Sequence, residues 1–362
     1  MSVRTLPGSK WACRGCAACC SSGFELGPVE DAVIADLEQA DIASLWPPAA
    51  AGPWYQRRPG RDGRTYAFLS QNAGRCVFLR DDDLCAVHAL LGGHRKPGFC
   101  QEFPYHVVEE PRGLVAIVRP SCGGLHQTFI DGPSLTPADL SEVVSLPRVY
   151  PHRRFAPDAV EVLPGTTVSL DAWLQLEDAA IAAIEAHPHA GPDTAIALVR
   201  EALVQGTGAE PPAPRPAQAI AGCQAIGMAL GKVMQAVLAQ GGGPADRAAF
   251  AQEAAERLPR AVTALDQPLP PVDAETAAYI HRLLRGQLLA KQWEAWGSVH
   301  AGLGQFHLGI TMARALSADA SLSAFDAPYR HWLRFAANAM IQHVLRSARV
   351  ALTDVFLHTP RR

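Results

Sequence analysis

Apolar residues recur at helical spacing over most of the chain after about residue 138, whereas the N-terminal third has short apolar runs broken by Pro, Gly and Asp. A period of 3.6 residues places apolar side chains on one stripe of each helix, so the C-terminal part predicts a helical bundle. We expect helices over Pro137–Val144, Leu170–Ala186, Pro192–Gln205, Gln218–Gln240, Pro244–Leu265, Ala274–Ala290, Trp293–Ser317 and Ala327–Phe356.

The N-terminal third predicts one helix, from Pro28 to about Glu38, because Pro and acidic residues favour the first turn. Residues 47–63 are rich in Pro, Gly and Arg and predict a loop. Short strands are expected at Thr65–Leu69, Arg75–Leu79, Tyr105–Glu109 and Leu114–Arg119.

The predicted fold class is α+β, with two domains. A small cysteine-rich unit with short hairpins would occupy residues 1–132, and a mainly α-helical bundle would occupy residues 133–362. A proline-rich linker near residues 209–216 interrupts the helical part.

Composition narrows the classes of function. The chain has 362 residues, of which 48% are hydrophobic and 19% charged, enough apolar surface for a folded core. Its net charge is −3, so basic residues do not outnumber acidic ones, and we expect no nucleic-acid partner. The sequence opens without an apolar secretion signal and has no uninterrupted run of about 18 apolar residues. We therefore expect a cytoplasmic protein that does not enter a membrane.

Eight of the nine cysteines fall within the first 122 residues. In a reducing compartment, such crowding indicates metal binding more than disulfides. The remaining cysteine, Cys223, is expected to be an ordinary buried side chain.

The first cysteines form the run Cys13-Arg-Gly-Cys16-Ala-Ala-Cys19-Cys20. Two intervening residues allow a tight turn to bring two sulfurs to one ion or cluster, and bacterial ferredoxins begin their cluster motif with this spacing. Adjacent cysteines seldom bind one ion together, since the ring that they close is strained. One of Cys19 and Cys20 is therefore expected to bind the first site, and the other to point elsewhere.

A second set comprises Cys76, Cys85, Cys100 and Cys122. Cys76 and Cys85 flank an Asp-rich turn and predict a β-hairpin with one cysteine on each arm. The eight thiols suffice for one four-cysteine site with spares or for two sites. His88 follows Cys85 at ligand spacing, but a backbone hydrogen bond is the preferred interpretation for it.

These residues resemble the YkgJ-type cysteine-cluster family of zinc- or iron-chelating proteins, which includes flagellin lysine-N-methylases. The resemblance spans roughly residues 11–124. Its matching pieces are Cys13-x-x-Cys16-x-x-Cys19-Cys20, Gly23-Phe24, Cys76-Val-Phe-Leu, Leu84-Cys85-x-x-His88 and Lys96-Pro97-x-x-Cys100-x-x-Phe103-Pro104-Tyr105.

The resemblance implies that all eight cysteines bind metal. For the methylase branch it implies an iron–sulfur cluster and methyl transfer from S-adenosylmethionine to protein lysines. No residue of the helical part matches a catalytic role, and no G-x-G-x-x-G follows a predicted strand.

Three hypotheses remain open on the sequence alone. The favoured one is an iron–sulfur protein, with protein-lysine methylation and a protein substrate as its extension. The second is a zinc-stabilised module that binds a protein partner through its helices. The third is a metal-handling protein, and mononuclear iron is a further choice of metal. Catalytic residues and oligomeric state are not predicted.

Overall fold

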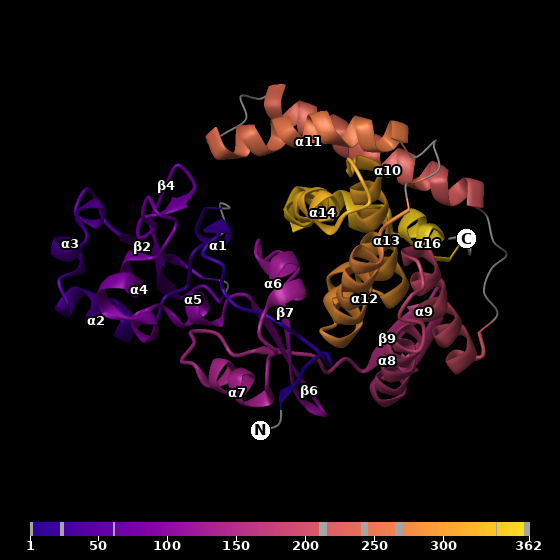
Figure 1. Ribbon diagram of the computed structural model, residues 1–362, viewed down its shortest axis with the longest axis horizontal. Helices are drawn as coiled ribbons and strands as arrows, with labels where there is room; N and C mark the ends of the chain where they lie inside the picture. Colours follow the sequence, from indigo (N-terminus) through magenta and orange to yellow (C-terminus); the bar gives the residue numbers. More distant parts are fainter. Residues whose placement is uncertain are drawn as a thin grey trace. The chain divides into compact units, whose positions relative to one another are not determined.

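The computed structural model describes residues 3–21, 25–60, 62–209, 216–239, 245–264, 269, 271–337 and 339–357. The fold class is α+β, as predicted, and the chain divides into two compact units, Met1–Arg154 and Phe155–Arg362 (Figure 1). Within the described residues, every helix is too short or too polar to span a bilayer.

Unit 1 contains a four-stranded sheet in the order β1-β7-β6-β8. Strands β6 (Tyr105–Glu110) and β7 (Gly113–Val118) form an antiparallel hairpin, as the sequence predicted. Strand β1 (Val3–Arg4) pairs in parallel with β7, and β8 (Arg153–Arg154) pairs in parallel with β6. Because β8 belongs to this sheet, residues 133–154 pack with unit 1, although the predicted boundary lay at 132/133.

Unit 1 also contains two smaller two-stranded hairpins. Strand β2 (Tyr55–Pro59) pairs with β3 (Thr65–Leu69), so part of the predicted loop at 47–63 is a strand, and that prediction was wrong. Most of β2 is exposed, and it therefore lacks the apolar alternation that marks a half-buried strand. Strands β4 (Gln71–Asn72) and β5 (Arg75–Cys76) are joined by two residues with positive φ, the geometry of a tight hairpin turn.

Short helices complete unit 1. The predicted helix near residues 28–38 is confirmed as α2 (Asp31–Gln39), which buries Ile34 and Leu37 in a core shared with β3 and Phe78. The other helical segments are α1 (Ala18–Ser21), α3 (Ile42–Leu45), η1 (Pro47–Ala49), α4 (Ala86–Leu91), η2 (Gly93–Arg95), α5 (Gly98–Glu102), α6 (Leu125–Asp131) and α7 (Pro137–Ser145).

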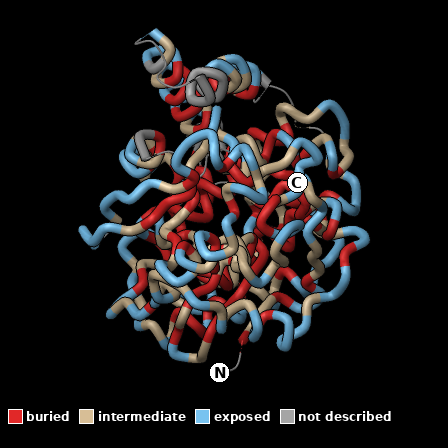
Figure 2. Tube along the Cα trace, turned by 90° about the vertical axis from the view of Figure 1, so that its left-hand side faces the viewer, coloured by how far each residue is buried: buried red, intermediate tan, exposed pale blue. Residues whose placement is uncertain are grey.

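Unit 2 is mainly helical and contains both buried and exposed residues (Figure 2). Helices α8 and α9 lie side by side, as do α10 and α11 (Figure 1). The described helices are α8 (Leu170–Glu185), α9 (Pro192–Thr207), α10 (Pro216–Ala239), α11 (Ala245–Ala264), α12 (Ala274–Leu289), η3 (Gln292–Trp296), α13 (Val299–Leu316), α14 (Leu322–Ala337), α15 (Ala339–Ser347) and α16 (Arg349–Leu357).

Three features of unit 2 differ from the sequence prediction. A hairpin of β9 (Ala159–Leu163) and β10 (Thr166–Ser169) precedes α8, in a segment for which the sequence predicted no element. The predicted helix Trp293–Ser317 is divided into two elements at Gly297, which has φ +84°. The short helix η3 ends before this glycine, and the Ser298 side chain caps the start of α13 after it. The predicted helix Ala327–Phe356 is replaced by three shorter helices, α14, α15 and α16. Residues 210–215 of the predicted linker lie outside the described residues.

The core of unit 2 contains a charged pair. Lys291 and Glu177 are both fully buried, and their Nζ and Oε2 atoms are 2.9 Å apart. The Lys291 ammonium also donates to the Leu289 carbonyl at 2.9 Å and lies 5.8 Å from the centre of the Phe155 ring. These contacts satisfy a cation that would otherwise be costly to bury. The aromatic side chains of Tyr279, Trp293 and Phe306 are buried in this unit.

Candidate metal centre

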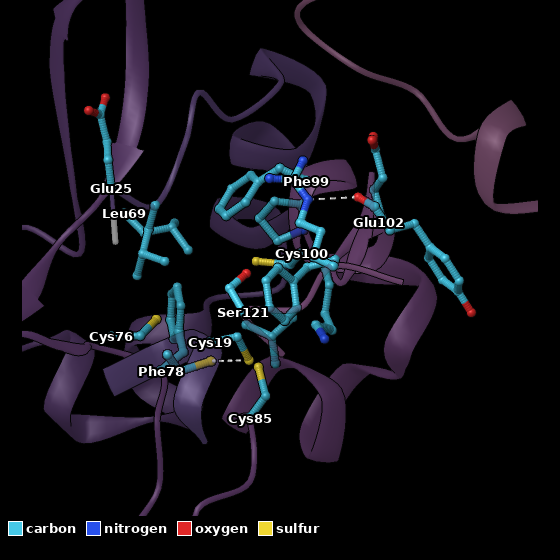
Figure 3. Close-up of a pocket in the computed structure, with 18 residues that line it drawn as sticks. Cys19, Glu25, Leu69, Cys76, Phe78, Cys85, Phe99, Cys100, Glu102 and Ser121 are labelled. Carbon is cyan, nitrogen blue, oxygen red and sulfur yellow. Dashed lines mark hydrogen bonds between the residues drawn. The ribbon is translucent and has the colours of Figure 1, made fainter. Parts of the chain in front are cut away.

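Five of the eight N-terminal cysteines converge on one cavity of unit 1. The cavity has a volume of about 430 Å³ and is lined by Cys19, Cys20, Cys76, Cys85 and Cys100. Figure 3 shows the labelled cysteines around this common space. All nine cysteines of the chain are free thiols. The fold therefore joins the end of the first cysteine run to most of the second set.

The vicinal pair lies in the single-turn helix α1. Ala17 has φ +52°, and its carbonyl accepts from the Cys20 amide at 2.8 Å, so the chain turns sharply before the pair. The Cys19 and Cys20 sulfurs are 3.6 Å apart, and both line the cavity. The expectation that one would point elsewhere is therefore not what the structure shows.

The two thiols of this pair differ in acidity. A hydrogen bond from Cys20 lowers the pKa of Cys19 to about 6; burial opposes this shift, and the Lys96 charge supports it. The same hydrogen bond, with burial, raises the pKa of Cys20 far above its usual value. Cys19 is thus the thiolate of the pair, and Cys20 is the thiol that donates to it.

Cys76 and Cys85 enter the cavity from neighbouring segments. Cys76 ends β5 and is buried, and this burial raises its pKa to about 11. Cys85 precedes α4, and only the bridge between Leu79 and Cys85 remains of the predicted hairpin. The second arm is a helix because the chain turns at Cys85, where the Ala86 amide donates to the Phe78 carbonyl at 2.8 Å.

Cys100 lies on α5, which the motif Lys96-Pro97 precedes. The Cys100 amide donates to the Pro97 carbonyl at 2.9 Å. Helix α5 packs tightly, since a Cβ atom on Gly98 would lie 2.1 Å from the Pro147 carbonyl oxygen. Burial raises the pKa of Cys100 well above its usual value, and the Lys96 charge opposes that shift.

Two cationic side chains, Lys96 and Arg119, also line the cavity. Lys96 makes no ion pair within the described part of the chain, and its charge favours the thiolate forms of Cys19, Cys76 and Cys100. The two acidic lining residues are partnered elsewhere: Glu25 by Arg58 at 3.4 Å and Glu102 by Arg148 at 2.8 Å. The cavity therefore favours bound negative charge, such as that of several thiolates.

The sequence alone does not predict a role for either cation. Lys96 belongs to the motif Lys96-Pro97-x-x-Cys100, and its position close to Cys100 in the sequence could have indicated that its charge acts on the thiols. Arg119 was seen only as the end of a strand, and nothing in the sequence places it near the cysteines. Its Nε atom donates to the Tyr105 carbonyl at 3.0 Å.

The remaining predicted ligands do not line this cavity. Cys13 and Cys16 are exposed in the segment before α1, and Cys122 is buried between β7 and α6. His88 is exposed on α4 and also lies outside the lining. Cys223 lies in unit 2, where burial raises its pKa to about 12. Gly23 and Phe24 of the matched motif lie outside the described residues.

The donor chemistry of the cavity fits a thiophilic metal. Thiolates select zinc, copper(I) and iron–sulfur clusters, whereas hard cations prefer oxygen ligands. In the arrangement that the structure describes, however, no three Cys, His, Asp or Glu side chains are grouped closely enough to hold a single ion. The thiols surround a space larger than one ion rather than a closed four-ligand site.

Comparison with known proteins agrees with this chemistry. Residues 12–123 match the model of the CxxCxxCC family, which is described as "Putative zinc- or iron-chelating domain". No curated protein and no solved structure matches the chain. Five of the eight predicted cysteine ligands line one cavity inside the matched region. Residues 12–123, less than half of the chain, are therefore similar to the CxxCxxCC domain, and this segment contains all eight N-terminal cysteines.

Proposed function

We propose that unit 1 binds an iron–sulfur cluster in the thiol-lined cavity. The observation that carries this proposal is the convergence of five cysteines on a space of about 430 Å³. Pockets of roughly 300–1,000 Å³ hold small molecules, and a single ion bound by thiolates needs no such space. A cluster supplies several iron atoms, so each thiolate can bind a different one.

The spacing of the thiols also favours a cluster over zinc. A structural zinc site holds four ligands around one ion, with sulfur at about 2.3 Å. No three candidate ligands of the described residues are grouped in that way. The alternatives, zinc or mononuclear iron, would require the cavity to contract around one ion.

We assign Cys19, Cys76, Cys85 and Cys100 as the thiolates that hold the cluster. Cys19 is chosen over Cys20 because the hydrogen bond from Cys20 keeps it ionised. Cys20 then acts as a donor to a ligand sulfur, a contact that tunes such centres. Lys96 offsets part of the negative charge, and Phe78 and Phe99 add apolar side chains to the lining.

The methyl-transfer hypothesis rests on the resemblance noted in the sequence. No contact among the described residues of unit 2 adds support for it, so S-adenosylmethionine and a protein-lysine substrate stay predictions. Their direct test is equilibrium binding of S-adenosylmethionine to the metal-loaded protein.

The test of the proposed function is the iron content of matched cysteine variants, purified without oxygen. Cys100→Ser removes a cavity thiol, and we expect it to lose most of the bound iron. Cys223→Ser removes a buried thiol of unit 2, and we expect it to keep the wild-type iron content. Equal iron in wild type and Cys100→Ser would overturn the assignment of the cavity as the metal centre.

A further inference from the structure

The cavity of unit 1 is lined by a cation that the cluster assignment does not use. Arg119 follows β7, lines the cavity and is exposed to solvent, so it lies where the cavity opens. The charge of Glu102 acts on Arg119, and Figure 3 shows Cys19 and Cys85 on the side of the cavity away from Glu102. The cavity therefore has a thiol side, around Cys19 and Cys85, and a second side near Arg119.

Two contacts fix the position of Arg119. Its amide donates to the Pro104 carbonyl at 2.8 Å, and its Nε atom donates to the Tyr105 carbonyl at 3.0 Å. Both acceptors lie at the start of β6, so the hairpin of β6 and β7 sets the direction of the guanidinium. A guanidinium held in this way is ordered before a ligand arrives, which lowers the cost of binding.

The far end of the guanidinium is available to a ligand. A guanidinium has five N–H donors, of which only the one on Nε is used by the Tyr105 carbonyl. Within the described part of the chain, no carboxylate pairs with the two Nη atoms of Arg119. Glu102 pairs with Arg148 instead, at 2.8 Å. Two parallel Nη–H groups match the two oxygens of one carboxylate.

The rest of the lining is suited to the body of an organic ligand. The Ser121 hydroxyl is directed into the cavity in Figure 3, but much of the lining is apolar. Pockets of this size with apolar walls and a few polar groups bind small organic molecules. The apolar side chains of the lining include Leu26, Leu69, Phe78, Val87, Phe99 and Phe103.

We propose that the cavity binds an organic acid, with its carboxylate on the Nη atoms of Arg119 and an apolar body among the apolar lining. Lys96, whose charge favours the thiolate forms, stays with the thiol side. The inference deepens the proposed function by naming a class of ligand, and it rests on that function for the cluster beside which the acid lies.

The test is isothermal titration calorimetry of the full-length protein, purified without oxygen, with 3-phenylpropionate. This probe has one carboxylate and one aromatic ring. 3-Phenylpropionamide lacks the charge, and propionate lacks the ring. We expect one 3-phenylpropionate per chain and an affinity about tenfold or more lower for each comparison compound, because each lacks one of the two contacts.

Three variants locate the carboxylate. Arg119→Gln should bind 3-phenylpropionate about tenfold or more weakly and should keep the wild-type affinity for 3-phenylpropionamide. Arg119→Lys keeps the charge but loses the planar fork, so its affinity for the acid should fall between those of wild type and Arg119→Gln. Arg64→Gln is the matched control, since the Arg64 side chain is 82% exposed and lies outside the lining, and it should bind as wild type does.

Iron measured in each sample separates this proposal from the cluster assignment. Iron-containing wild type that does not bind 3-phenylpropionate would overturn the acid site and leave the cluster in place. Equal affinity of wild type and Arg119→Gln for the acid would overturn it too, and so would displacement of the acid by an equal concentration of inorganic phosphate. Iron-free wild type that binds the acid through Arg119 would support the acid site and refute the cluster.

Discussion

Removal of the Cys20 thiol should make Cys19 much less reactive in the metal-free protein. The hydrogen bond from Cys20 is the largest influence on Cys19, whose pKa falls from the ordinary 9.0 to about 6. At pH 7 a thiol of pKa about 6 is roughly 90% ionised, whereas one of pKa 9 is about 1% ionised. Cys20→Ala should therefore lower the thiolate fraction of Cys19 at pH 7 by about 50-fold or more.

The assay is a short pulse of iodoacetamide on metal-free protein at pH values from 5 to 9, followed by mass spectrometry of the Cys19 peptide. Wild type should reach half of its maximal rate near pH 6, and Cys20→Ala should do so at or above pH 9. Cys20→Ser provides the matched control, since its hydroxyl can still donate a hydrogen bond. Identical pH profiles for Cys19 in wild type and Cys20→Ala would refute the reasoning.

The helical unit offers three further predictions. Asp193→Asn should reduce the free energy of unfolding at neutral pH and make that free energy less dependent on pH in acid. Burial raises the pKa of Asp193, but His307 and Arg314 lower it well below the usual range. The carboxylate therefore stabilises the fold above the pKa of Asp in the unfolded chain, and this stabilisation is lost as the pH falls through the lower, folded-state pKa. Urea unfolding between pH 3 and 7 measures this, and parallel pH curves would contradict it. Glu177→Gln should cost about 3–5 kcal/mol in unfolding free energy, because Lys291 stays buried without its carboxylate, and adding Lys291→Met should recover most of that cost. Gly304→Ala should lower the melting temperature, since its Cβ atom would lie 1.9 Å from the Leu352 carbonyl oxygen; an unchanged melting temperature would mean that α13 and α16 move apart easily.

Periodicity predicted most of the helices, because helical spacing and end signals are local properties of the chain. Helix α8 begins at Leu170 as expected, and α7 at Pro137 carries the capping box of Thr136 and Asp139. Strand β2 was missed because most of its side chains are exposed and its partner, not its own pattern, defines it. The break at Gly297 was missed because one residue in the left-handed region interrupts an otherwise continuous helical pattern.

The cysteine count and spacing predicted a thiol-based metal domain, and the family match supports that coarse prediction. Which cysteines meet was beyond the sequence, since Cys19, Cys76 and Cys100 are brought together by separate turns of the chain. The role of Lys96 was equally hidden, because an electrostatic effect depends on distance in space. The same limit applied to Cys122, whose neighbours come from the start of the chain.

The measurement that tests the central claim most directly is the content of iron, acid-labile sulfide and zinc in wild-type protein purified without oxygen, taken with its ultraviolet–visible spectrum. The account predicts several irons per chain, a matching amount of sulfide and a broad absorbance near about 400 nm. A colourless protein with stoichiometric zinc and no sulfide would contradict the iron–sulfur assignment and would make the cavity the site of a single ion.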